Sequence, residues 1–161
     1  MHDNLIERDA TGHVIGAFFE VYSALGFGFL EHVYSLALEC ELLKRGRLVG
    51  REVPIPVFYK GVELTSQRAD MIVDERVVVE IKSTYVLPPP TQRQTLNYLQ
   101  ATNLQVALIL HFGPKPKFYR LVHSNKQHGA AVVRVPSARV RVPRKLRDPD
   151  DGLESSNHAT L

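Results

Sequence analysis

Residues 69–82 read ADMIVDERVVVEIK, two short apolar runs separated by the polar triplet Asp74-Glu75-Arg76. Runs of this length that are rich in β-branched residues are typical of strands, and the polar break between them predicts a β-hairpin. Side chains alternate between the two faces of a strand, so Glu80 and Lys82 are predicted to share one face. Asp70 opens the preceding strand. The stretch therefore predicts two carboxylates and a lysine close together on neighbouring strands.

Asp70, Glu80 and Lys82 have a chemical use when they lie together. An antiparallel pair of strands can bring two carboxylates within about 5 Å of each other. Such a pair suits Mg²⁺ or Mn²⁺, which would offset the repulsion between the acids and activate a bound water. Lys82 could orient that water or stabilise charge on a phosphoryl group. The spacing alone leaves open a second interpretation, in which these residues are solvated charges that discourage edge-to-edge aggregation.

Helical and extended patterns flank the hairpin. Apolar residues recur at helical spacing over 5–25 and from about 30 to 45, with glycines at the end of each run. The second helix has apolar residues at Val33, Leu36, Ala37, Cys40 and Leu43. The other expected elements are strands over 53–59 and 62–64 joined by a turn at Lys60-Gly61, a helix over 91–102 capped by Thr91, and strands over 106–112 and 118–122.

The order of these elements predicts an α/β fold with a mixed sheet. An antiparallel meander is followed by a helix that crosses over to 106–112, and the continuous apolar run there is typical of a strand buried on both faces. Helices should flank this sheet. We expect one domain over 1–125 and a tail over 126–161 that is largely disordered, because its composition cannot form a core. In the alternative, the alternating valines of the tail form an extra edge strand.

The formal net charge of +3 does not describe the domain. Residues 126–161 hold seven basic and four acidic side chains, which leaves thirteen of each in 1–125. The domain is therefore not a uniformly basic nucleic-acid binder. No apolar run is long enough to span a membrane, and the N-terminus does not look like a secretion signal. Cys40, the single cysteine, is expected to be a small buried hydrophobe, and a cytoplasmic location is the default.

Several motifs in order resemble the PD-(D/E)xK nuclease superfamily, and specifically the family named for its GxxExxY motif. That motif reads GFLEHVY here, residues 28–34, and it is followed by RAD at 68–70, VEIK at 79–82 and QTLNYL at 94–99. The resemblance covers about residues 5–123. It implies a restriction-endonuclease-like core and a metal-dependent phosphodiesterase.

The resemblance also implies roles for individual residues. Asp70 and Glu80 would ligate Mg²⁺ or Mn²⁺ together with the backbone carbonyl of Ile81, and Lys82 would be the catalytic lysine. Glu31 matches an acid that many members contribute from the first helical layer, and Gln94 matches a glutamine that usually faces the site. One departure is Thr91, which stands where relatives tend to have a histidine.

Two of these assignments have structural alternatives. The carboxylate of Glu31 stands at a helix N-terminus, where the helix dipole alone would stabilise it. Arg68 lies two residues before Asp70, so an ion pair with a site carboxylate competes with phosphate binding. Tyr34 and Tyr98 are expected to pack in the core rather than to contact substrate. The seven histidines show no metal-binding spacing, and no nucleophile elbow, phosphate loop or dinucleotide motif occurs.

Three functions follow from different classes. The first is a Mg²⁺- or Mn²⁺-dependent nuclease, with DNA as the expected substrate. The second is a catalytically silent module of the same fold that binds nucleic acid or a partner protein. The third is a regulatory protein whose basic tail is its interface. The tail contributes Arg139, Arg141, Arg144 and Lys145 as candidate nucleic-acid contacts. The sequence leaves open whether the protein forms a homodimer.

Overall fold

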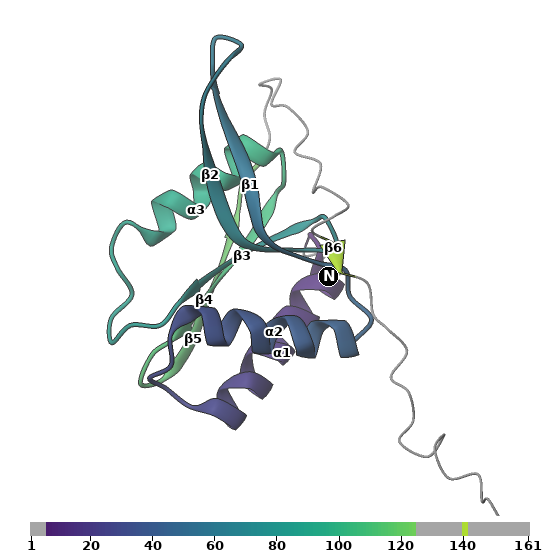
Figure 1. Ribbon diagram of the computed structural model, residues 1–161, viewed down its shortest axis with the longest axis vertical. Coiled ribbons are helices and arrows are strands. Elements are labelled where there is room, and N and C mark those ends of the chain that lie inside the picture. Colours follow the sequence, from purple (N-terminus) through teal and green to yellow (C-terminus); the bar gives the residue numbers. More distant parts are fainter. Residues whose placement is uncertain (1–5, 125–139, 142–161) are drawn as a thin grey trace, which may run out of the picture.

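The computed structural model describes residues 6–124 and 140–141, which form three helices and six strands (Figure 1). The helices are α1 (Arg8–Leu25), α2 (Glu31–Lys44) and α3 (Thr91–Thr102). The strands are β1 (Val49–Tyr59), β2 (Val62–Val73), β3 (Val77–Lys82), β4 (Val106–Phe112), β5 (Pro116–Val122) and β6 (Val140–Arg141). No helix among these residues is long and apolar enough to cross a membrane.

The strands form one mixed sheet in the order β5-β4-β3-β2-β1-β6. β1, β2 and β3 make an antiparallel meander, and β4 runs parallel to β3, with Val77 opposite Val106 and Lys82 opposite His111. The parallel step requires a crossover, which α3 provides. All seven residues of β4 are buried, as expected for a strand covered on both faces. This arrangement confirms the predicted α/β fold with a mixed sheet.

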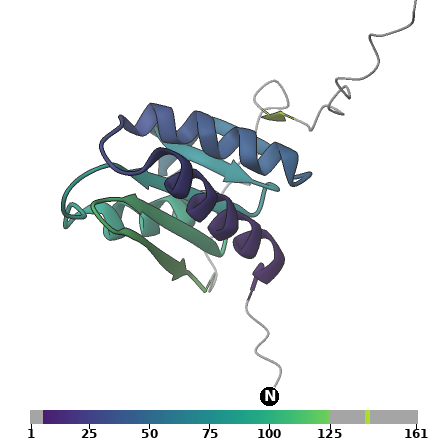
Figure 2. The same cartoon turned by 90° about the horizontal axis from the view of Figure 1, so that it is seen from below.

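Helices cover both faces of the sheet. α1 and α2 lie together on one face (Figure 2), where Phe18, Tyr34 and Leu38 pack with Phe112. The ring centroids of Tyr34 and Phe112 are 4.0 Å apart in a stacked arrangement. On the other face α3 contributes Leu99 and Tyr98 to a second, smaller core. The sheet is therefore the middle layer, and residues near the ends of its strands can be reached from either helical layer.

β1 and β2 extend beyond the rest of the sheet as a two-stranded arm (Figure 1). The turn at Lys60-Gly61 is confirmed, and both residues have positive φ, which glycine adopts without strain. β2 is continuous over 62–73, where the sequence suggested two separate runs. The β1–β2 register shifts between Val57 and Phe58, whereas Glu52, which has φ 52°, and Asp70 are not themselves among the paired residues. The arm thus leaves the sheet beside Asp70.

The buried residues of α2 are not the apolar positions of its helical pattern. The buried residues are Tyr34, Ser35, Leu38, Glu39 and Leu42, whereas Leu36 is 39% exposed. Cys40, predicted to be buried, is exposed. The helix carries apolar side chains around most of its circumference, so periodicity alone does not indicate which side packs. The side that packs also holds an ion pair between Glu39 and Arg51 of β1, with 2.9 Å between Oε2 and Nε.

The prediction that Thr91 caps α3 was also wrong. The N-cap is Pro90, Thr91 is the first helical residue, and no side chain caps the helix. Thr91 is 1% exposed and packs inside, so its hydroxyl cannot serve the free N–H groups from outside the helix. By contrast, Gly46 follows α2 as predicted, and its N–H donates to the carbonyl of Leu43 at 3.0 Å.

A two-residue strand from the predicted tail joins the sheet edge. β6 pairs antiparallel with β1, with Val140 opposite Gly50 and Arg141 opposite Val49. This short pairing agrees with the edge-strand alternative for these two residues. The remainder of the tail lies outside the described residues, including Arg139, Arg144 and Lys145.

Candidate active site

The candidate site lies where β2 and β3 separate, at a gap bounded by residues 68–70 and 80–82 that we call the β2–β3 fork. The β2–β3 ladder begins beside the turn and ends at Met71 opposite Val79. β3 nevertheless continues beside β4 as far as Lys82. The edge of β3 beyond Val79 therefore needs another partner for its backbone N–H groups.

Asp70 supplies that partner. Its Oδ2 accepts a hydrogen bond from the backbone N–H of Ile81 at 2.7 Å, across the fork. Burial raises the pKa of Asp70 above its usual range, although this hydrogen bond and the charge of Lys82 act in the opposite direction. The nearby Glu31 carboxylate raises it further. Asp70 is thus fixed at the fork with a second acid close enough to affect its ionisation.

Glu80 and Lys82 share one face of β3, as predicted. Lys82 Nζ donates to Glu80 Oε1 at 2.7 Å, and only 4% of the Glu80 side chain is exposed. Burial raises the pKa of Glu80 to about 7, and the Asp70 carboxylate adds to this increase. Burial would lower the pKa of Lys82, but the hydrogen bond to Glu80 and the surrounding carboxylates raise it overall. The two acids of the fork are therefore electrostatically coupled, with a lysine as counter-ion.

Glu31 reaches the end of β3 from the other helical layer. It is the first residue of α2, and the backbone N–H of Ser83 donates to its Oε1 at 3.4 Å. Ser83 Oγ also donates to the carbonyl of Phe29 at 2.5 Å. Glu31 raises the pKa of both Asp70 and Glu80. The structure thus brings Glu31, Asp70, Glu80 and Lys82 to one end of β3.

Gln94 approaches from α3 through a tyrosine. Its Nε2 donates to the hydroxyl of Tyr98 at 2.8 Å, one helical turn away. Tyr98 is 3% exposed, and its pKa is raised by burial and by the charge of Glu80. Both tyrosines pack as predicted, since Tyr34 is fully buried and donates to the carbonyl of Gly26 at 2.5 Å. Gln94 is therefore linked to the acidic residues indirectly, because it contacts the Tyr98 hydroxyl, which is close enough to Glu80 to feel its charge.

Arg68 does not form an ion pair with a carboxylate of the fork. Its Nη1 lies 3.5 Å from Oε1 of Glu52 in β1, and 67% of its side chain is exposed. It still lowers the pKa of Asp70 through its charge. Arg68 is thus an exposed cation at the mouth of the fork.

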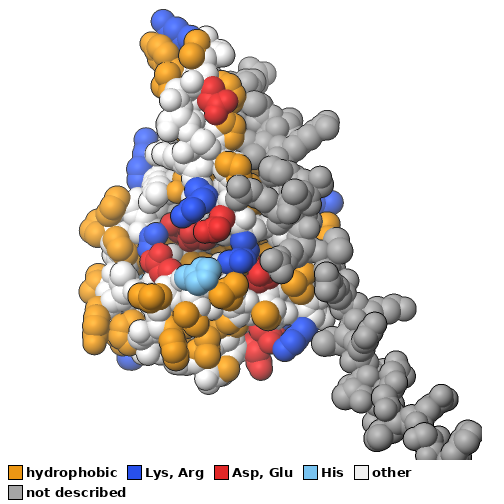
Figure 3. All heavy atoms as spheres, viewed as in Figure 1, with side chains coloured by type: hydrophobic (Ala, Val, Ile, Leu, Met, Phe, Trp, Pro, Cys, Tyr) orange, Lys and Arg blue, Asp and Glu red, His pale blue; other side chains and the backbone are white. Residues whose placement is uncertain are grey.

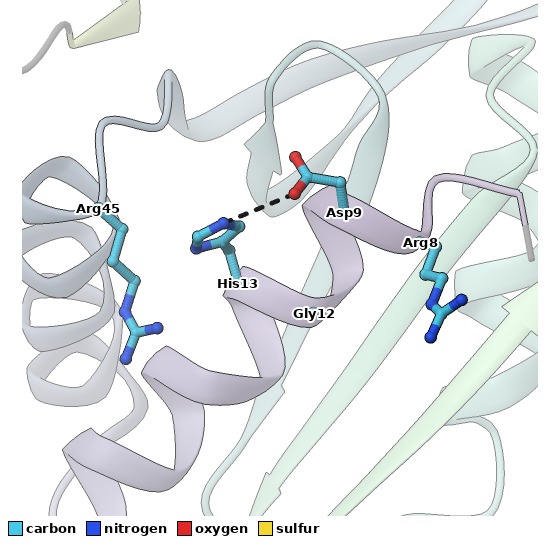
Figure 4. Close-up of a pocket in the computed structure, with 5 residues that line it drawn as sticks. All are labelled: Arg8, Asp9, Gly12, His13 and Arg45. Carbon is cyan, nitrogen blue, oxygen red and sulfur yellow. Dashed lines mark ion pairs between the residues drawn. The ribbon is translucent and has the colours of Figure 1, made fainter.

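A small cavity of about 140 Å³ opens beside the fork, lined by residues that include Glu31, His32, Arg68, Asp70 and Ile81. Figure 3 shows side chains of both charges and a histidine gathered on this face below the arm. A wider hollow of about 520 Å³ lies along α1 and is lined by Arg8, Asp9, Gly12, His13 and Arg45 (Figure 4). It is remote from the fork, because Asp9 pairs with Arg47, which also binds Asp74 at the opposite end of β3.

The residues of the fork fit a divalent cation with two protein carboxylates. Glu80 Oε2 is buried and has no hydrogen-bond partner among the described residues, which leaves a lone pair for a cation. Within the same residues no group of three or more Asp, Glu, His or Cys side chains is arranged to hold a metal. Mg²⁺ is commonly held by one or two carboxylates, with waters and substrate phosphates completing its shell. Asp70 and Glu80 meet that requirement, whereas Glu31 is not gathered with them as a third ligand.

A family model described as the PD-(D/E)XK nuclease superfamily matches residues 8–121, which is more than half of the chain. The chain belongs to this superfamily. Its mixed sheet flanked by helices is consistent with the restriction-endonuclease-like fold of that superfamily. The comparisons with curated proteins and with solved structures gave no match. The matched range contains every helix and strand from α1 to β4 and most of β5.

Some residues around the fork carry no signal in the sequence. Ser83 joins the α1–α2 loop to the end of β3, but an isolated serine after a strand is common. His111 lies opposite Lys82 and its Nε2 is 2.7 Å from the carbonyl of Thr84, so it supports the loop that follows the lysine. The one indication of this role in the sequence is that His111 lies within an apolar strand, because a buried histidine needs a polar partner.

Proposed function

We propose that this protein is a Mg²⁺- or Mn²⁺-dependent nuclease that hydrolyses phosphodiester bonds in DNA at the β2–β3 fork. The observation that carries the proposal is the pairing of two coupled acids, Asp70 and Glu80, with Lys82 beside them and an unpartnered Glu80 oxygen. Burying two carboxylates together is unfavourable, and the single positive charge of Lys82 balances only one of them. A function in metal binding explains why the fold retains both.

Each residue of the fork has a role in this proposal. Asp70 and Glu80 would hold the cation, with the backbone carbonyl of Ile81 as a further ligand. When bound, such a cation would supply Lewis-acid polarisation of a phosphoryl oxygen and a lowered pKa of a water. Lys82 donates a hydrogen bond from the same face and stabilises negative charge as it develops on the phosphate. Its raised pKa keeps it protonated at neutral pH, so it acts as a donor rather than as a base.

The remaining residues complete the site from the two helical layers. Glu31 acts on the ionisation of the acids and accepts from Ser83, and it would reach the cation through water. Gln94 orients the Tyr98 hydroxyl next to Glu80. Arg68 is the phosphate contact nearest to Asp70, and Arg139, Arg141, Arg144 and Lys145 are further contacts in the tail. The GFLEHVY motif favours the GxxExxY family within the superfamily.

The first experiment is a calorimetric titration of the protein with Mn²⁺. Wild type should bind the ion, and Asp70→Ala should abolish binding while circular dichroism shows an unchanged fold. Glu63→Ala removes one exposed acid from the arm and is the matched control, which should bind as wild type does. Cleavage of plasmid and single-stranded DNA, with and without chelator, then tests the reaction. Equal Mn²⁺ binding by wild type and Asp70→Ala would refute the assignment of the site.

A catalytically silent nucleic-acid-binding or protein-binding module of the same fold is the second candidate. This candidate is favoured by Thr91, which is buried at the start of α3 and stands where members of the GxxExxY family tend to have a histidine. A silent module would bind nucleic acid equally well with Lys82 replaced by alanine and would cleave none. The nuclease proposal requires cleavage that Lys82→Ala loses.

A further inference from the structure

The two loops that carry site residues meet in an exposed apolar surface. One loop joins α1 to α2 and precedes Glu31, and the other follows Lys82. They contribute Phe27, Phe29, Leu30, Tyr85 and Val86, which we call the loop rim. Tyr85 is 79% exposed, Val86 and Leu30 are 78% exposed, and Phe29 is 47% exposed. Figure 3 shows hydrophobic side chains along the edge of the molecule where these loops lie, beside the charged centre of the face.

The loop rim is held in place by contacts on both sides of Tyr85. The Tyr85 and Phe27 rings are 5.0 Å apart and packed edge to face at 77°. Ser83 Oγ donates to the carbonyl of Phe29, and Thr84 Oγ1 donates to the carbonyl of Val86 at 2.8 Å. His111 Nε2 lies 2.7 Å from the carbonyl of Thr84. An exposed aromatic ring is thus fixed three residues beyond Lys82.

We propose that Tyr85 stacks against an unpaired base of the nucleic acid bound at the fork, so that the preferred substrate is single-stranded or frayed. This inference rests on the proposed function and names its substrate class. A paired base inside a duplex is already stacked on both sides, and only an unpaired base can offer a ring face to Tyr85. Aromatic stacking of this kind tolerates any base sequence.

The charge of the domain supports stacking as the source of affinity. Residues 1–125 carry equal numbers of acidic and basic side chains, so neutralisation of phosphates is weak outside the tail. The position of Tyr85 also favours a base over a second copy of this chain. The loop rim is interrupted by the exposed carboxylate of Glu31 and by Ser83, which a dry protein interface would have to desolvate. A nucleotide can place its base on the ring and leave these groups in water.

The test is a binding titration of full-length protein in chelator, in which the fluorescence anisotropy of a labelled oligonucleotide reports binding. The probes are a single-stranded DNA, the same strand with a run of abasic units, and the matching duplex. Tyr85→Ala should weaken binding of the normal single strand by about 5- to 100-fold. Binding of the abasic strand should change by less than about twofold, and Tyr85→Phe should bind as wild type does. Tyr59→Ala, at an exposed tyrosine on the arm, is the matched control and should have no effect.

Other results would overturn the inference. These are unchanged single-strand binding by Tyr85→Ala, an equal loss on the abasic strand, an equal loss in Tyr59→Ala, or wild-type preference for the duplex. Loss of a wild-type dimer in Tyr85→Ala, measured by sedimentation, would assign the loop rim to self-association instead. Parallel Mn²⁺ titrations separate the two proposals: a protein that binds Mn²⁺ and cleaves DNA but ignores Tyr85→Ala keeps the nuclease function. A protein that binds neither Mn²⁺ nor any strand loses both.

Discussion

Replacing Glu80 by glutamine should stabilise the protein at pH 8 in a chelator. Burial, with a contribution from Asp70, raises the pKa of Glu80 from its ordinary 4.5 to about 7. The folded state therefore binds this proton more tightly than the unfolded chain does. Stability is greatest when the carboxyl is protonated and falls as the pH rises from about 4.5 through about 7. Glutamine removes the charge and with it this loss.

The size of the effect follows from that difference in pKa. At 1.36 kcal/mol per pKa unit, ionising buried Glu80 costs roughly 3 kcal/mol of stability above pH 7. The pKa of about 7 already includes the effect of Lys82, and glutamine keeps an oxygen that can accept the Lys82 hydrogen bond. The variant should therefore be more stable than wild type by roughly 3 kcal/mol at pH 8. At pH 5 most of the gain should disappear, because Glu80 of folded wild type is then protonated.

Urea unfolding of both proteins between pH 5 and pH 8.5 measures this difference. The matched control is Glu39→Gln, at a carboxyl that is 6% exposed and forms an ion pair with Arg51. This control should lose stability at pH 8, since it breaks a buried ion pair. Adding Mn²⁺ should stabilise wild type and have little effect on Glu80→Gln. If Glu80→Gln unfolds at lower urea than wild type at pH 8, Glu80 is an ordinary ion-pair partner and the reasoning fails.

Three further predictions concern the core, the lysine and the tail. Phe112→Ala should lose about 3–5 kcal/mol of unfolding free energy, because the ring is fully buried and stacked on Tyr34; a loss under 1 kcal/mol in urea would contradict this packing. Lys82→Ala should lower the rate of DNA cleavage by about 100-fold or more and leave Mn²⁺ binding measurable by calorimetry, whereas unchanged cleavage would exclude the lysine from the reaction. Deleting residues 126–161 removes the two-residue β6 from the sheet edge, so the protein should still melt cooperatively with a slightly lower midpoint and an unchanged Mn²⁺ affinity. The deletion should weaken DNA binding and flatten its dependence on salt, because six basic residues from Arg134 to Arg147 are removed. An unchanged salt slope, or an unfolded product, would show that the tail is not an electrostatic arm.

The sequence by itself was sufficient wherever the determining forces are local. Strand alternation placed Glu80 and Lys82 on one face, and their 2.7 Å hydrogen bond agrees with this. The polar triplet at 74–76 predicted the hairpin, Gly46 predicted the end of α2, and the apolar run of β4 predicted a strand buried on both faces. Each of these depends on a few neighbouring residues, whose backbone preferences and periodicity are visible in the chain.

Only the tertiary structure decided which residues from distant segments meet. The end of the β2–β3 ladder at Val79 allows Asp70 to bond Ile81, and where that ladder ends depends on how the strands pair in the assembled sheet. The exposed side of α2 and of Cys40 was determined by packing against α1 and β1, because a helix that is apolar around most of its surface has no unique inner face. The raised pKa of Glu80 has the same origin. Glu80 is buried beside the Asp70 carboxylate only when the three layers assemble, and no sequence spacing specifies the desolvation that results.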